Sequence, residues 1–567
     1  MQLRVVRQRH RRLWHEMLFQ TQQVSYHANG SFAYSTARLK KQTTCQLAYT
    51  LVGPLLLVSQ CRVKGILTTQ GEDMSRSLNF GSVNFGRSVA VLSLVAIATV
   101  GCSNRNSGDT ATTQAPATNA PAVTDAPTAT DAPVTTDAPT GPMFGTMASP
   151  CGPATDAGVP TIADGQNGGD TIKLGTANDH GYEGAPGTTL EMLDAAKAFA
   201  GWCNAQGGVR GLPIEIVDLD GKLFSVPPSM EQACSEVFAM AGGGWVFDDQ
   251  MYPRFHECGM ISFSGYAVSA AASMANGKIQ PIPNPANEKP AQWLNWARDT
   301  YPEAIKKVAL LYGDFLTTKS VADQLAATMK AVGGFGEPSM MTYNPAGEAN
   351  WTPFAQKLKS DGITYLSFVG TDSNLVLLYK AMREVGYVPE VVLNDANFYS
   401  SIMVAEGNAV ANEGFLARTM YAPFEEADQF PGMASYLDMM ETYNPEGRIA
   451  GLGLQATSAL LMFVTSANAC LDSNSNVLER ECVLAEGLKI NSWTGGGLHS
   501  ETNPAAKTSP KCGLIMGVKD GKWARVYPEL GSADDNGGGW HCDEDGAVEI
   551  EGDFGDVTSG VDPTRPN

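Results

Sequence analysis

The stretch from Thr171 to Asp218 constrains the fold most, because it carries one complete strand–helix–strand unit. An apolar run at 172–174 is typical of a buried strand, and the run 213–218 alternates apolar and polar residues as a half-buried strand does. Two strands joined through a helix favour a parallel sheet with a right-handed crossover. Ligands of such sheets bind beyond the carboxyl ends of the strands, which predicts a site near the loop 177–187.

The helix of this unit has start and stop signals. Thr188, followed by Glu191 three residues later, predicts a capping box at the first turn. Apolar residues then recur at helical spacing as far as Phe199. The pair Gly207-Gly208 ends the helix, because glycine adopts the left-handed conformation that side-chain-bearing residues disfavour.

Strands and helices continue to alternate, and a proline-rich break at 281–290 separates two series of similar size. Two such series predict two α/β lobes with a cleft between them. Asp520-Gly521, between two apolar runs, predicts a late hairpin. The expected strands are 244–247, 260–264, 308–312, 340–343, 363–368, 391–393, 415–420, 512–518 and 522–527, and the expected helices are 230–241, 319–331, 352–360, 373–385, 431–443 and 451–468.

Charge and motifs exclude several function classes. The 567 residues carry a formal net charge of −20, so the chain repels phosphates and we expect no nucleic-acid partner. Gly451–Ala456 resembles a dinucleotide fingerprint but lacks the leading strand, and His256-Glu257 lacks the second histidine of a zinc helix. The acidic, glycine-rich tail 531–567 lacks the ligand spacing of a calcium loop and is predicted to be solvated. We expect no catalytic residue, no metal and no cofactor.

The chain has 11 cysteines, and eight of them follow residue 150. An even set in an exported chain favours disulfides over buried free thiols, although eight cysteines allow 105 connectivities. Cys234–Cys258 and Cys470–Cys482 are favoured because they close short loops, and Cys512–Cys542 is the next choice. Cys151 and Cys203 remain as the fourth pair.

The region 74–102 is similar to a bacterial lipoprotein signal peptide. It has a positively charged start and an apolar stretch at 88–100 that is short for a membrane span. Thr99-Val-Gly-Cys102 resembles a lipobox with threonine in place of the usual leucine, and Cys102 would carry the lipid. A plain signal peptide or an anchor helix are the alternatives. Residues 1–73 are basic and without periodicity, and we interpret them as a non-native N-terminal extension.

An Ala/Thr/Pro-rich tract follows the lipobox. TDAP occurs at Thr124, Thr130 and Thr136, and such a composition buries too little apolar surface to fold. We predict a disordered stalk over 103–165 that lifts a domain away from a membrane.

The order of motifs after the stalk resembles the type I periplasmic-binding-protein fold, and within it the branched-chain amino-acid (Leu/Ile/Val) binding family of ABC importers. The resemblance covers roughly 170–530. The motifs that carry it are NAQGGVRG at Asn204–Gly211, followed by PIEIVD, then ECGMISFSG at Glu257–Gly265, KVALLYGD at Lys307–Asp314 and AMREVGYVP at Ala381–Pro389.

This resemblance implies an α/β fold of two doubly wound parallel-sheet lobes, joined by a hinge with three crossovers. The N-terminal lobe would comprise 166–288 and 421–511, and the C-terminal lobe 289–420 and 512–530. The implied function is binding of a small polar ligand, an amino acid or a related amine or amide, for an ABC permease. The protein would be a monomer on the outer face of the cell membrane, anchored by the lipid on Cys102.

The resemblance also implies where the ligand binds. Asp248 and Asp249 stand where the family has small hydroxyl residues. Two aspartates at this place would favour a cation or a polyhydroxyl compound over a carboxylate as the ligand. Asp395 corresponds to the family's acidic partner of the ligand ammonium. Phe315 lies where the family often has an aromatic lid. The candidate ligand-binding residues are Tyr182, Asp248, Asp249, Gln250, Gly265, Tyr266, Ala267, Asp314, Phe315, Thr317, Asp372 and Asp395.

Two other functions fit the same sequence. A ligand-sensing ectodomain of this fold would signal to a membrane partner instead of a permease. A surface hydrolase would use Asp248, Asp249 and Asp395, and it needs two carboxylates about 5–10 Å apart in one pocket.

Overall fold

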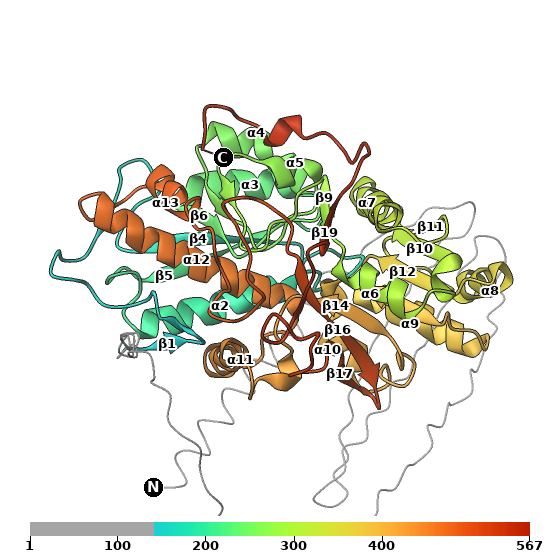
Figure 1. Cartoon of the computed structure of the whole chain (residues 1–567). Coiled ribbons are helices and arrows are strands. Elements are labelled where there is room, and N and C mark those ends of the chain that lie inside the picture. Colours follow the sequence, from blue (N-terminus) through green and yellow to red (C-terminus); the bar gives the residue numbers. More distant parts are fainter. Residues whose placement is uncertain (1–140, 567) are drawn as a thin grey trace, which may run out of the picture. The chain divides into compact units, whose positions relative to one another are not determined.

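The computed structural model describes residues 141–566, which form two α/β lobes (Figure 1). The predicted extension 1–73, the signal peptide 74–102 with Cys102, and the stalk up to residue 140 lie outside the described residues. Each lobe is built on one sheet with helices on both of its faces.

The first lobe contains a five-stranded sheet in the order β5-β4-β6-β7-β8, and every neighbouring pair is parallel. Leu174 of β4 lies opposite Ile216 of β5 and Ala239 of β6. Helices α2 and α12 cover one face, and α3 and α4 cover the other. The strands are β4 (Ile172–Asn178), β5 (Ile214–Asp220), β6 (Ala239–Ala241), β7 (Ser262–Phe263) and β8 (Lys278–Ile279); the helices are α2 (Leu190–Ala205), α3 (Val226–Glu236), α4 (Tyr252–Glu257), α5 (Ala270–Met274), α11 (Pro431–Tyr443), α12 (Gly451–Ser473) and α13 (Arg480–Gly487).

The second lobe contains an eight-stranded sheet in the order β11-β10-β12-β13-β14-β16-β17, with β18 also paired to β16. Helices α6 and α7 pack on one face, and α8 and α9 on the other. The strands are β10 (Val308–Gly313), β11 (Ser339–Tyr343), β12 (Tyr365–Val369), β13 (Val391–Asn394), β14 (Leu416–Thr419), β16 (Cys512–Lys519), β17 (Lys522–Tyr527) and β18 (His541–Cys542); the helices are α6 (Gln292–Thr300), α7 (Leu316–Val332), α8 (Thr352–Asp361), α9 (Asp372–Glu384) and α10 (Ser401–Val404).

Most predicted elements agree with the structure, including the hairpin of β16 and β17 around Asp520-Gly521. One pair is wrong. The third strand is 239–241, inside the predicted helix 230–241, and the predicted strand 244–247 is a loop. Ala-Met-Ala has no strand signature of its own, and only its buried place between β4 and β7 makes it a strand.

The predicted capping box of α2 is also wrong. The helix begins after Thr189, which has a left-handed backbone and no side-chain capping bond. The Thr188 hydroxyl instead donates to the Ala185 carbonyl (2.6 Å). Glu191, the expected partner in the box, is almost fully buried and faces the interlobe cavity.

The chain passes between the lobes several times. It leaves the first lobe after β8, through the hinge strand β9 (Glu288–Pro290), and returns after β14 to α11, which packs on α2. It then leaves again after α13 to form β16. Helix α12 is long and apolar enough to cross a membrane, yet 78% of its apolar window is buried inside the protein, so it is a core helix here.

Residues 141–165, predicted as the end of the stalk, are ordered on the first lobe. A hairpin of β1 (Met143–Phe144) and β2 (Met147–Ala148) buries Phe144 against Trp202, with ring centroids 5.3 Å apart. Strand β3 (Thr161–Ile162) pairs with β15 (Val477–Leu478). The Ala/Thr/Pro tract ends near residue 142, and the residues after it include apolar side chains that can pack.

The tail 531–567, predicted to be solvated, also packs on the protein as far as residue 566. Strand β18 joins the second sheet, β19 (Ala547–Glu549) pairs with the hinge strand β9, and the 3-10 turn η5 (Thr558–Gly560) contacts α4 and α5 of the first lobe. Arg565 donates to the Met260 carbonyl at 2.7 Å. The tail is acidic, but Trp540, Ile550 and Phe554 are buried, and these apolar residues hold it in place.

All four expected disulfides are present: Cys151–Cys203, Cys234–Cys258, Cys470–Cys482 and Cys512–Cys542. Three of them tie together parts of the first lobe, and Cys512–Cys542 ties the tail to β16.

Replacing Cys512 and Cys542 together by serine should lower the free energy of unfolding by about 2–4 kcal/mol, because the unfolded chain loses a cross-link. The tail should also become sensitive to limited proteolysis. Denaturant unfolding and mass spectrometry of the fragments measure the two effects.

The matched control is Cys234→Ser with Cys258→Ser, which opens a loop of similar length inside the first lobe. This control should lose similar stability and keep a protease-resistant tail. Equal cleavage of the tail in both variants would contradict the anchoring role of Cys512–Cys542.

Candidate functional site

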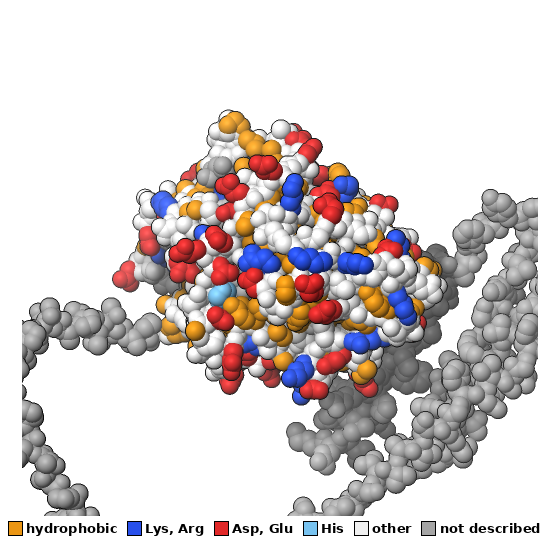
Figure 2. Space-filling view, turned by 45° about the vertical axis from the view of Figure 1, so that its right-hand side comes forward, with side chains coloured by type: hydrophobic (Ala, Val, Ile, Leu, Met, Phe, Trp, Pro, Cys, Tyr) orange, Lys and Arg blue, Asp and Glu red, His pale blue; other side chains and the backbone are white. Residues whose placement is uncertain are grey.

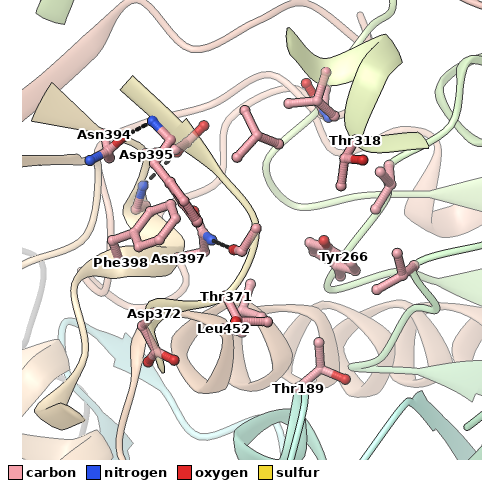
Figure 3. A pocket seen from close by; sticks show the side chains of 18 of the residues that line it. Thr189, Tyr266, Thr318, Thr371, Asp372, Asn394, Asp395, Asn397, Phe398 and Leu452 are labelled. Atoms are coloured by element: carbon pink, nitrogen blue, oxygen red, sulfur yellow. Dashed lines mark hydrogen bonds between the residues drawn. The ribbon is translucent and has the colours of Figure 1, made fainter. Parts of the chain in front are cut away.

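A cavity of about 390 Å³ lies between the two lobes. Its walls come from the carboxyl ends of the strands: the loops after β4, β6 and β7 in the first lobe and those after β12, β13 and β14 in the second. Figure 3 shows Asn394, Asp395 and Phe398 on one side of it, Tyr266 on another, and Leu452 of α12 below. Both lobes therefore supply side chains to one space.

In the first lobe, a buried carboxylate holds two loops at the cavity rim. Asp179 follows β4, is fully buried, and accepts the backbone N–H of Leu223 and of Val246, both at 2.8 Å. These bonds join the loop after β5 to the loop after β6. Burial raises the pKa of Asp179 from 3.8 to about 6, although the two N–H donors act in the opposite direction.

Asp248 likewise fixes the loop after β7 by accepting backbone N–H groups. It is 3% exposed and accepts the backbone N–H of Val268 (2.8 Å) and of Ser269 (3.0 Å). Burial raises the pKa of its carboxyl group, and the hydrogen bonds from Ser269 and Val268 lower it. The carboxylate fixes the loop that carries Tyr266 and Ala267, and it does not line the cavity.

In the second lobe, both cavity carboxylates already have cationic partners. Asp395 accepts from Arg418 (2.7 Å), the third residue of the neighbouring strand β14. Asp372, at the first turn of α9, accepts from the Ser400 hydroxyl (2.7 Å) and from Arg448 (2.9 Å). A ligand cation would therefore have to compete with Arg418 for Asp395 and with Arg448 for Asp372.

Arg448 connects the lobes. It follows α11, its backbone N–H donates to Asp194 of α2 (2.9 Å), and its guanidinium donates to the Gly187 carbonyl (3.2 Å). The same guanidinium lies 3.5 Å from the Glu191 carboxylate and donates to Asp372 in the other lobe. One side chain thus bonds the wall of the first lobe to that of the second.

Four aromatic rings meet at the rim of the cavity. Tyr182, Phe224 and Phe247 come from loops of the first lobe, and Phe315 precedes α7 in the second. The ring of Phe315 lies 5.5 Å from that of Phe247 and 6.1 Å from that of Phe224. Edge-to-face pairs at these distances attract one another, so the rings form an apolar contact between the lobes.

The predicted ligand-binding residues divide into two groups. Six line the cavity, namely Tyr182, Tyr266, Ala267, Phe315, Asp372 and Asp395. Six others do not, namely Asp248, Asp249, Gln250, Gly265, Asp314 and Thr317. The wrong position of the predicted third strand explains why Asp248, Asp249 and Gln250 do not line the cavity. The loop that follows β6 begins at Gly242, and residues 248–251 form a 3-10 turn further along the chain. The three carboxylates that a hydrolase would need do not share the cavity.

A family model of periplasmic binding proteins matches residues 171–522, which is more than half of the chain. The chain belongs to the periplasmic binding protein family. This is a family of ligand-binding proteins, not of enzymes, whose members act outside the cytoplasm with ABC transporters. The segments 141–170 and 523–566, which pack on the lobes, lie outside the match.

Solved structures share the fold of this periplasmic binding protein. A leucine-binding protein from Thermotoga maritima has a TM-score of 0.52 at 14% identity, covering 63% of this chain and 98% of its own. A fatty acid ABC transporter substrate-binding protein from Thermomonospora curvata has 0.52 at 16%, covering 65% and 93%. A solute-binding protein from R. palustris, in complex with 4-hydroxybenzoate, has 0.51 at 15%, covering 63% and 96%. These likenesses confirm the predicted type I fold, and no curated protein matches the chain.

Four charged residues that line the cavity of this binding protein were not predicted as ligand contacts: Glu191, Lys289, Arg418 and Arg448. Arg418 has a local signal, since it lies near the carboxyl end of the predicted strand 415–420. Arg448 has none, because its partners Glu191 and Asp372 are distant in sequence and only the fold brings them together.

The raised pKa of Asp179 predicts a pH-dependent stability. Because the folded state prefers the protonated form, the contribution of Asp179 is fully present below pH 4 and is lost as the pH rises through about 6. The free energy of unfolding of the wild type, relative to that of the Asp179→Asn variant, should therefore fall by about 2 kcal/mol between pH 4.5 and pH 7.5. Urea unfolding at the two pH values measures it.

Asp170→Asn, which changes an exposed carboxylate, is the control and should leave the pH dependence of stability unaltered. The assignment is wrong if the Asp179→Asn variant shows the same pH dependence as the wild type.

Proposed function

We propose that this chain is an extracytoplasmic solute-binding lipoprotein that binds a small organic ligand between its lobes and delivers it to an ABC permease. The observation that carries the proposal is the cavity itself, since its wall is drawn from both lobes and Arg448 bonds to each of them. The family membership supports the transport role. The solved structures of this fold include proteins whose names specify leucine, fatty acid and 4-hydroxybenzoate, so the fold admits varied ligands.

The mechanism is hinge closure. A ligand that contacts both walls favours the state in which the walls are together, by the difference in its affinity for the closed and open states. The Arg448–Asp372 bond and the aromatic contacts of Phe315 exist only while the lobes are together, so they add to the stability of that state. The permease then recognises surfaces that both lobes contribute.

The charge of the outer surface is consistent with the expectation that the protein does not bind nucleic acid. Figure 2 shows acidic and basic side chains interspersed on one face, with a row of basic residues across its middle. The formal net charge of −20 favours repulsion from phosphate backbones.

A thermal-shift screen of the full-length chain against amino acids, polyamines, amides, organic acids, urea and sugars tests the binding function. A ligand at 100 times its Kd should stabilise the protein by about 2.7 kcal/mol. Thr371→Trp should abolish the shift by filling the cavity, while the exposed Thr300→Trp should not. An absence of stabilisation by every class would contradict the proposal.

The lipid anchor has its own test. Cys102→Ala should release the exported protein from the membrane fraction into the soluble fraction, because the lipidated thiol is lost. Thr124→Ala, in the predicted stalk, is the control and should leave the protein in the membrane fraction. Recovery of the wild-type chain from the cytosol would rule out this localisation.

A further inference from the structure

Lys289 is the feature of the cavity that most constrains the ligand. It lies on the hinge strand β9 and lines the cavity, and its ammonium group donates to the Asn284 side chain at 2.8 Å. Among the described residues, no carboxylate lies within ion-pair distance of it. The other cations of the cavity, Arg418 and Arg448, each have a carboxylate partner.

The surroundings of Lys289 leave its ammonium group without an ion-pair partner among the described residues. Asp395 and Arg418 act on the pKa of Lys289 in opposite directions, and they form an ion pair with each other at 2.7 Å. Two buried donor atoms of residues that line the cavity, Nε of Arg418 and Nδ2 of Asn394, have no acceptor among the described residues. Burial lowers the pKa of Lys289 to about 7, so its protonated form is costly here and an anion beside it would stabilise that form.

The opposite wall carries two carboxyl groups, those of Asp372 and Glu191, and Arg448 lies beside both of them. One oxygen of Asp372 accepts its neighbour's N–H, from Ser373 (2.8 Å), and the other accepts from Ser400 and Arg448. Burial raises the pKa of Glu191, which favours its neutral form, and Arg448 lies beside it. A ligand ammonium would therefore compete with a cation already in place.

The rest of the cavity suits an elongated apolar body. It follows one face of α7, where Thr318, Val321, Leu325 and Thr328 recur every three or four residues. The eleven residues of helix from Thr318 to Thr328 span about 15 Å. Trp293, Phe368 and Phe398 line the cavity as well.

We propose that the ligand is an organic acid with an apolar chain or ring body, whose carboxylate pairs with the ammonium group of Lys289 while its body lies along α7. This inference rests on the proposed solute-binding function, and it narrows the amino-acid, amine or amide expected from the sequence. It also moves the charged contact from Asp395 to Lys289.

Two matched ligand series test the inference by titration calorimetry on the full-length chain. The first is 3-phenylpropionate with its amide, its amine and phenylalanine, and the second is octanoate with its amide and amine. Within at least one series the acid should bind about tenfold or more tightly than every other member. Lys289→Met should remove this preference, and Lys289→Arg should keep it. Lys330→Met, which removes an exposed charge from α7, is the control and should bind as the wild type does.

The outcomes separate the two proposals. Tighter binding of an amine or of phenylalanine than of the acid overturns the carboxylate assignment, as does an acid preference that survives Lys289→Met. If both acids fail while a sugar, polyamine or amide stabilises the chain, this assignment is wrong and the solute-binding function stands. If no compound of any class binds, both proposals fail.

Discussion

Buried carboxylates that accept backbone N–H groups hold the binding cavity together. An ionised carboxylate away from water is costly unless several donors converge on it, so each such group fixes the loops that supply those donors. Asp179 joins the loops after β5 and β6, and Asp248 fixes the loop after β7. In the other lobe, Asp372 accepts the N–H of its neighbour Ser373 and the hydroxyl of Ser400, which ties α9 to the segment after β13. The cavity wall is therefore preorganised by side chains that for the most part stand behind it.

The fold was largely predictable because parallel sheets covered on both faces produce strong sequence patterns. Strands such as β10 are continuous apolar runs, and the helices between them keep one apolar face. The prediction of the fold failed where the sequence pattern is weak. Ala239–Ala241 is a strand because its neighbours in the sheet require one, and that requirement is not visible in three small or flexible side chains. The wrong position of the third strand also placed Asp248, Asp249 and Gln250 among the predicted ligand-binding residues, and these three residues do not line the cavity.

The candidate site was only partly predictable, for a related reason. The rule that ligands bind at strand ends places Tyr266, Phe315 and Asp395 correctly beside the cavity. It gives no information on which of those groups are already neutralised. The Asp395–Arg418 pair depends on two adjacent strands in register, and the Arg448 contacts depend on segments separated by more than 70 residues. Ion pairing, which decides the charge that a ligand meets, is a property of the folded chain alone.

The C-terminal segment has a mechanical consequence for the hinge. It is cross-linked to the second lobe at Cys542, pairs with the hinge strand through β19, and ends on the first lobe at Arg565. Because the family match stops at residue 522, this segment is a strap added to the shared fold. While both attachments hold, its length between them sets an upper limit on how far the lobes separate.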